Sequence, residues 1–156
     1  MKNTLMIRVC MLAMAWCCAA ASVWACSSAV ISGKVTPDGR PLLWKNRETG
    51  HLLNHMAYVK GEKYDFVANV NSDNFPAKKE AWIGSNTAGF ALMNTQSYNL
   101  VKGDIADDDR GPDNGKVMYR ALEVCATVAD FCHFLDTIQK PSGIEANFGV
   151  IDAQGG

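Results

Sequence analysis

Residues 26–48 read CSSAVISGKVTPDGRPLLWKNRE, and this stretch decides the first element of the fold. Two runs rich in apolar and small residues, 27–35 and 41–44, stand on either side of the tetrapeptide TPDG at 36–39. Proline followed by Asp-Gly is typical of a tight turn, because proline presets φ and glycine accepts a positive φ. The pattern predicts an antiparallel hairpin with a bulge or loop near Ser32-Gly33.

The chain beyond this hairpin reads as further short strands. Runs of apolar residues alternate with polar ones, and turn-forming residues separate the runs. The expected strands are 55–60, 64–70, 81–83, 90–93 and 147–152. We expect an antiparallel meander rather than strands that alternate with helices. We expect Asn86 to form the turn before 90–93, because asparagine tolerates the left-handed conformation.

Two helices are expected before the last strand. Apolar residues recur at helical spacing in 117–125, which predicts a helix with one buried face. Thr127 and Asp130 have the spacing of a capping box, so a second helix is expected to begin there. Cys125 and Cys132 fall in these helices, and both core packing and a disulfide between them remain open. The expected fold class is a mixed α/β fold in the broad sense, and specifically α+β, with antiparallel sheets.

The first 25 residues have the character of a secretory signal peptide. Lys2 and Arg8 are their only charged residues, 9–21 is an uncharged apolar run, and small residues lead up to Ala25. The apolar run is shorter than the roughly 20 residues of a transmembrane helix. We expect cleavage after Ala25, no membrane span, and export to the periplasm or the extracellular space.

Cleavage after Ala25 makes Cys26 the first residue, with a free α-amino group. One interpretation is that the tetrapeptide at 23–26, VWAC, is a lipobox whose cysteine is acylated. The protein would then be a non-catalytic envelope lipoprotein that acts as a binding module. The other interpretation is that Cys26 is an N-terminal nucleophile. Trp24 favours the second, because lipoboxes have a small residue beside the cleavage position.

The residue types around Cys26 suit a nucleophile. A thiol titrates near pH 8.5 and an α-amino group near 7.7–8.0, so the amine is matched to take the thiol proton near neutral pH. The expected hairpin brings the end of its second strand beside Cys26. Lys45 would supply a cation that favours the thiolate. Glu48 would supply a carboxylate that holds the α-amino group.

This arrangement resembles the N-terminus of the linear-amide hydrolases. They form a branch of the N-terminal nucleophile superfamily that includes choloylglycine hydrolase, penicillin V acylase, acid ceramidase and the acyl-CoA:6-aminopenicillanate acyltransferase group. Their pattern Gly-Arg-Asn-x-Asp places the arginine beside the thiolate and the aspartate on the α-amino group. Lys45, Asn46 and Glu48 occupy these positions here. Lys45 is a point charge where the family has a planar arginine, and Glu48 is one methylene longer than aspartate.

A second stretch, GSNTAGFALMN at 84–94, resembles the family's Gly-x-Asn-x-x-Gly-Leu hairpin. The resemblance implies that Asn94 stabilises the oxyanion. It covers 26–156 and implies the N-terminal half of an αββα sandwich. Residues that complete the site are then expected beyond Gly156, and the fragment is expected to be inactive by itself.

Composition narrows the class of partner. The chain has 156 residues, a net charge of −1 and 48% hydrophobic residues. It is therefore about one domain, neither disordered nor basic enough for nucleic-acid binding. No cofactor is expected, and no metal is expected either, because Cys125, Cys132 and His133 lack the second ligand pair of a zinc site. The expected partner is a small-molecule amide, while hydrolysis or acyl transfer, the substrate, and assembly as a homo-oligomer stay open.

Overall fold

The computed structural model describes residues 26–97, 99–101, 103, 105 and 113–156, so the leader at 1–25 lies outside the described residues. The described residues form two antiparallel sheets and two α-helices, an α+β fold. The elements are β1 (Ser27–Ile31), β2 (Leu42–Asn46), β3 (Asn54–Val59), β4 (Phe66–Asn71), β5 (Ile83–Asn86), β6 (Ala91–Gln96), α2 (Asn114–Val124), α3 (Val128–Asp136) and β7 (Ala146–Ile151). In this part of the chain, no helix has the length and apolar character needed to cross a bilayer.

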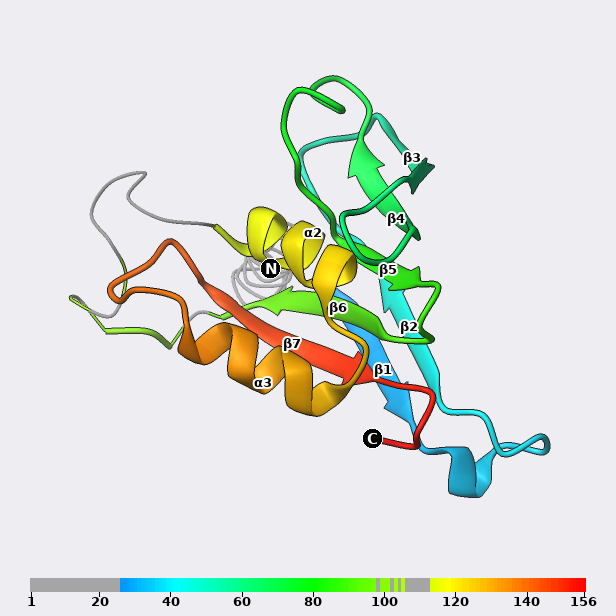
Figure 1. Ribbon diagram of the computed structural model, residues 1–156. Helices are drawn as coiled ribbons and strands as arrows, with labels where there is room; N and C mark the ends of the chain where they lie inside the picture. Colours follow the sequence, from blue (N-terminus) through cyan, green and yellow to red (C-terminus); the bar gives the residue numbers. More distant parts are fainter. Residues whose placement is uncertain (1–25, 98, 102, 104, 106–112) are drawn as a thin grey trace, which may run out of the picture.

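The helices α2 and α3 cover one face of the larger sheet, whose strand order is β3-β4-β5-β6-β7 (Figure 1). Ala68 and Leu92 are fully buried on this face, in one apolar cluster with residues of both helices. Leu122 of α2 lies so close to Gly84 of β5 that a Cβ there would be 2.8 Å from Leu122 Cδ1. The main hydrophobic core therefore lies between the helices and this face.

The β1–β2 hairpin packs on the other face, over β6 and β7 (Figure 1). Side chains alternate along a strand, so Met93 points away from the helices that bury Leu92. Met93 pairs with Gly149 of β7, and a Cβ at Gly149 would lie 3.2 Å from Val30 Cγ2 of β1. The molecule is thus built in three layers: helices, five-stranded sheet and hairpin.

The hairpin pairs as its sequence predicts, with Ser28 opposite Lys45. A short 3-10 helix, η1 (Gly33–Val35), lies where the bulge or loop is expected in the hairpin. Gly39 in the turn has a φ of 73°. Directly opposed residues of an antiparallel pair share a face, and so do residues two apart on one strand. This register places Cys26, Lys45 and Arg47 on the same face of the hairpin.

The turn at Asn86 forms by a different mechanism from the expected one. Gly89, with a φ of 82°, takes the left-handed conformation, and Asn86 has a negative φ. The Asn86 side chain instead accepts two backbone N–H bonds within the turn, at 3.1 Å each. Its Nδ2 donates to the carbonyl oxygens of Leu122, at 2.9 Å, and Cys125, at 2.7 Å. Asn86 therefore ties the β5–β6 turn to the end of α2.

The expected capping box is confirmed: Thr127 and Asp130 exchange both side chain to backbone bonds at the start of α3. The two helical cysteines are free thiols with different environments. Core packing is confirmed for Cys125, which is buried. For Cys132 both alternatives, a core position and a disulfide, are wrong, because α3 turns this residue outward while Phe131 faces the core.

Candidate active site

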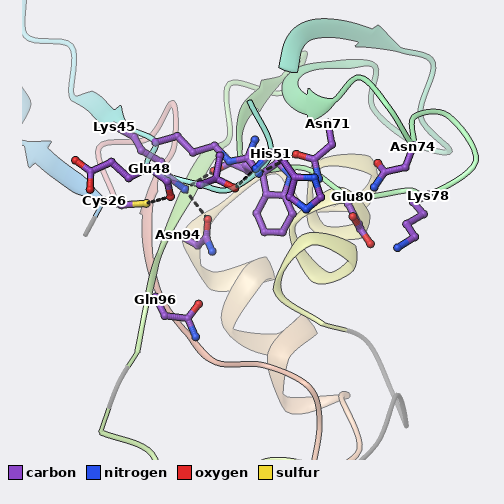
Figure 2. Close-up of a pocket in the computed structure, with 13 residues that line it drawn as sticks. Cys26, Lys45, Glu48, His51, Asn71, Asn74, Lys78, Glu80, Asn94 and Gln96 are labelled. Atoms are coloured by element: carbon purple, nitrogen blue, oxygen red, sulfur yellow. Dashed lines mark hydrogen bonds between the residues drawn. The ribbon is translucent and has the colours of Figure 1, made fainter. Parts of the chain in front are cut away.

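A cavity of about 450 Å³ lies where the hairpin meets one end of the five-stranded sheet (Figure 2). It collects side chains from the residue before β1, the end of β2 and the segment after it, the end of β4, the β4–β5 connection, and β6. The lining residues are Cys26, Lys45, Arg47, Glu48, Thr49, His51, Asn71, Asn74, Lys78, Glu80, Trp82, Asn94 and Gln96. The four residues expected from the sequence to carry chemistry, Cys26, Lys45, Glu48 and Asn94, are thus brought to one cavity.

Cys26 is half-buried at the edge of this cavity, directly before β1. Its Sγ donates to the backbone carbonyl oxygen of Glu48 across the hairpin, at 3.6 Å. The Glu48 carboxylate accepts from Asn46 Nδ2 at 3.4 Å. Glu48 therefore holds the thiol through its main chain. The expected role of its carboxylate, to hold the α-amino group of Cys26, stays a prediction.

Lys45 fastens the hairpin to the five-stranded sheet. Its Nζ donates to the Trp82 carbonyl oxygen at 2.9 Å and to Asn94 Oδ1 at 2.7 Å. The β5–β6 ladder ends at the pair Ile83–Met93, so the Trp82 carbonyl lies just past the last ladder bond. A backbone acceptor left at a strand end needs a donor, and Lys45 supplies it.

Burial of the Lys45 ammonium lowers its pKa from 10.5 to about 8. A Cys26 thiolate acts in the opposite direction and raises this pKa, whereas the Arg47 charge lowers it further. Desolvation disfavours the charged form of an amine, and a neighbouring cation adds to that cost. Lys45 is consequently still protonated at neutral pH, but it gives up its proton far more readily than an ordinary lysine.

Arg47 also lines the cavity, and the sequence interpretation missed it. Its Nη1 and Nη2 donate to Asn69 Oδ1 at 3.3 Å and to Asn71 Oδ1 at 2.8 Å. Its guanidinium carbon lies 4.7 Å from the centre of the Trp82 ring, in a cation–π contact. Burial lowers the Arg47 pKa, which the charge of Cys26 partly offsets. The signal was present in the sequence, because a residue two after Lys45 shares its face of the strand.

Asn94, in β6, is 6% exposed and bonds to Lys45 of the hairpin. Because its Oδ1 accepts from Lys45 Nζ, the amide is oriented with Nδ2, its donor end, away from Lys45 (Figure 2). A fixed N–H donor in a partly closed cavity is what stabilisation of a developing oxyanion requires. The geometry therefore allows Asn94 the role that the sequence resemblance implies.

Comparison with protein-family models, curated proteins and solved structures gives no match to this chain. Its chemistry must therefore be argued from the cavity. A thiol, a lysine of lowered pKa, a fixed guanidinium and an oriented amide form a set that can generate a thiolate and support negative charge on a neighbouring atom.

Proposed function

We propose that the chain is an exported cysteine hydrolase or acyltransferase that acts on a linear, non-peptide amide, with Cys26 as its nucleophile. The observation that carries this proposal is the convergence of Lys45, Arg47 and Asn94 on the Cys26 side of one cavity. Two positive charges favour the thiolate, and the amide favours the oxyanion. The three observed layers are consistent with part of the αββα sandwich of N-terminal nucleophile hydrolases, which we propose as the fold.

The reaction begins when the α-amino nitrogen of Cys26, freed by cleavage after Ala25, takes the thiol proton. The sulfur then forms a bond to the amide carbonyl carbon, and the carbonyl oxygen becomes an oxyanion beside Asn94 Nδ2. Collapse of this intermediate breaks the C–N bond while the α-ammonium of Cys26 returns its proton to the departing nitrogen. The amine is released, and a thioester remains on Cys26. Water or a second amine then accepts the acyl group.

The cavity suits a small substrate rather than a folded polypeptide. At about 450 Å³ it falls in the range typical of small-molecule sites. Its lining combines charged and amide side chains with the ring of Trp82. We therefore propose a compact amide as the substrate class.

The test is the intact mass of the exported protein before and after incubation with p-nitrophenyl butyrate. We expect a chain that begins at Cys26 with a free amine and gains one butyryl group, located on Cys26 by peptide mapping. The Cys26→Ala variant should gain none, with its thermal unfolding unchanged.

Two results of the same measurement contradict the proposal. A diacylglyceryl adduct on Cys26 would instead identify an envelope lipoprotein. A butyryl group that persists in Cys26→Ala would place the nucleophile elsewhere, for example on the exposed thiol of Cys132.

A further inference from the structure

The cavity extends beyond the thiol to an end lined by Arg47 and Lys78. Figure 2 shows Cys26 at one side of the cavity and Asn74 and Lys78 at the opposite side. Arg47 reaches toward this opposite side, because its guanidinium binds Asn71 Oδ1 at 2.8 Å. Resting on the proposed function, we propose that Arg47, assisted by Lys78, binds a carboxylate of the substrate, so that the amide cleaved at Cys26 belongs to an anionic molecule.

Arg47 is held in one orientation by three neighbours. Its Nη1 and Nη2 donate to the amide oxygens of Asn69 and Asn71, at 3.3 Å and 2.8 Å. The ring of Trp82 lies 4.7 Å from the guanidinium carbon. Two hydrogen bonds and a stacked ring fix the plane of the guanidinium, so little freedom is lost when a ligand binds. A fixed planar guanidinium matches the two oxygens of a carboxylate.

The charge of Arg47 lacks an anionic partner within the part of the chain that the structure describes. The oxygens that accept from it there belong to two neutral amides, and no carboxylate lies at ion-pair distance. A guanidinium has five N–H donors, and the two asparagines take two of them. Burial lowers the pKa of Arg47, so this cation has lost part of its hydration. A bound carboxylate would supply the missing negative charge and accept from the remaining donors.

Lys78 adds a second cation to the same end of the cavity. Its backbone N–H donates to the Asn74 carbonyl oxygen at 2.8 Å, so one turn of the β4–β5 connection carries both lining residues. The next residue, Lys79, faces elsewhere, with its Nζ 5.8 Å from the centre of the Tyr119 ring. Of these two consecutive lysines, only Lys78 lines the cavity, and Lys79 therefore serves as its matched control.

The two carboxylates that line the cavity leave room for this assignment. Glu80 is 9% exposed, and its stem packs at the start of α2, where a Cβ at Gly115 would lie 2.9 Å from Glu80 Cβ. The N-terminal end of a helix favours a negative charge, so Glu80 is stabilised there. The Glu48 carboxylate accepts from Asn46 on the hairpin. Because three lysine and arginine side chains line the cavity against two carboxylates, an anionic ligand is favoured over a cationic one.

Cleavage and carboxylate binding then use different parts of one cavity. The carbonyl carbon of the substrate lies at Cys26 Sγ, and its carboxylate lies at Arg47. Two kinds of substrate present such a carboxylate. A monoamide of a dicarboxylic acid carries it on the acyl part, whereas an N-acyl amino acid carries it on the amine part.

The experiment compares three chromogenic anilides in the full-length exported protein. Butyryl-p-nitroanilide is uncharged. Succinyl-p-nitroanilide has a carboxylate in place of the butyryl methyl group, and the third probe is butyryl-p-nitroanilide with a carboxylate on the nitrophenyl ring. We expect kcat/KM for one of the anionic probes to exceed that for the uncharged probe about 10-fold or more, mainly through a lower KM, because hydrogen bonds to charged groups have this strength. The preferred probe identifies the part of the substrate that carries the carboxylate.

Substitutions then locate the preference. In Arg47→Met the ratio of kcat/KM between the anionic and uncharged probes should fall to about one. Any effect of this substitution on the thiolate cancels in the ratio. Arg47→Lys keeps the charge without the planar guanidinium and should retain part of the preference. Lys78→Met should lower the ratio about two- to five-fold, because this lysine is exposed, and Lys79→Met should leave it unchanged.

Binding is measured without turnover by protection of the thiol. Iodoacetamide alkylation of Cys26 is followed by mass spectrometry, with the exposed thiol of Cys132 as the internal reference. The preferred anionic probe should slow alkylation of Cys26 at a lower concentration than the uncharged probe. In Arg47→Met this difference should disappear.

The outcomes separate the two proposals. Equal kcat/KM and equal protection for all three probes in the wild type, or a preference that survives Arg47→Met, overturns carboxylate binding at Arg47 and leaves Cys26 as the nucleophile. Chromophore release that survives Cys26→Ala overturns the proposed function. Selective protection by an anionic probe without chromophore release also overturns the proposed function and leaves the carboxylate binding. Absence of both release and protection contradicts both proposals.

Discussion

The two faces of the five-stranded sheet differ sharply in how they are covered. On the helix face, Phe66 and Ala68 of β4 are 2% and 0% exposed. On the other face, Val67 of the same strand is 41% exposed, and Met56 and Tyr58 of β3 are 61% and 63% exposed. The hairpin covers only the β6–β7 end of this second face.

The helix-covered face of the sheet mainly stabilises the fold, whereas the hairpin-covered face carries the polar groups of the cavity. Burial of apolar surface against α2 and α3 supplies most of the stabilisation, because it scales with the area removed from water. The hairpin layer places charged and polar groups at the edge of the sheet, where they cost desolvation. Substitutions on the two faces should therefore change different measured quantities.

The largest expected effect is on the helix face. Leu122→Ala should lower the free energy of unfolding by about 2–5 kcal/mol, because it leaves a cavity against Gly84 and its neighbours. Met56→Ala, on the open face, should change it by less than about 0.5 kcal/mol. Urea denaturation followed by circular dichroism measures both, and equal losses would contradict the comparison.

The next effect is on turnover. Asn94→Asp keeps an acceptor for Lys45 Nζ but removes the amide donor, so the proposed oxyanion loses its N–H. We expect turnover of butyryl-p-nitroanilide to fall about 100- to 1,000-fold, which is the usual effect of removing one oxyanion donor from an enzyme. The urea midpoint should move little. Turnover within a few-fold of the wild type would exclude Asn94 from the site.

Asn86 tests the link between the layers. Asn86→Ala removes four hydrogen bonds of a buried amide and leaves the carbonyl oxygens of Leu122 and Cys125 without this donor. We expect a loss of about 1–3 kcal/mol in the free energy of unfolding. Turnover per folded molecule should stay the same, and a selective loss of turnover would place Asn86 in the site.

The smallest expected effect is on how the free energy of unfolding changes with pH. Because the folded state lowers the Lys45 pKa from 10.5 to about 8, the unfolded chain binds a proton in this range that the folded chain does not. The stability of the wild type should therefore rise with pH, relative to Lys45→Met, between about pH 8 and 10.5. Urea unfolding at pH 7, 8, 9 and 10 measures this difference. Parallel pH dependences of the two proteins would contradict the lowered pKa.

Local signals were enough to predict the hairpin, the meander and both helices. The Asp38-Gly39 turn and the period of two in the flanking strand bring Cys26 and Lys45 together, and the Thr127–Asp130 spacing predicts the cap of α3. These features depend on residues close in sequence or directly paired, so a pattern in the chain is sufficient to reveal them.

Features that depend on the packing of separate elements were not predictable in this way. The alternation of the strand indicates that Arg47 shares a face with Lys45. Its partners Asn69 and Asn71 lie on β4, far away in the sequence, and no local pattern indicates them. The outward position of Cys132 likewise depends on which side of α3 meets the sheet. The turn at Asn86 was predicted correctly, but the reason given for it was wrong. The side chain of Asn86 bonds to the end of α2, which the local sequence does not indicate.

Lys45 also connects the two sheets, because its ammonium, on the hairpin, donates a hydrogen bond to the Trp82 carbonyl oxygen in the neighbouring layer. A charged donor makes a hydrogen bond roughly twice as strong as a neutral one. The same ammonium binds Asn94 Oδ1 of β6, so a single side chain attaches the hairpin to the sheet at two points.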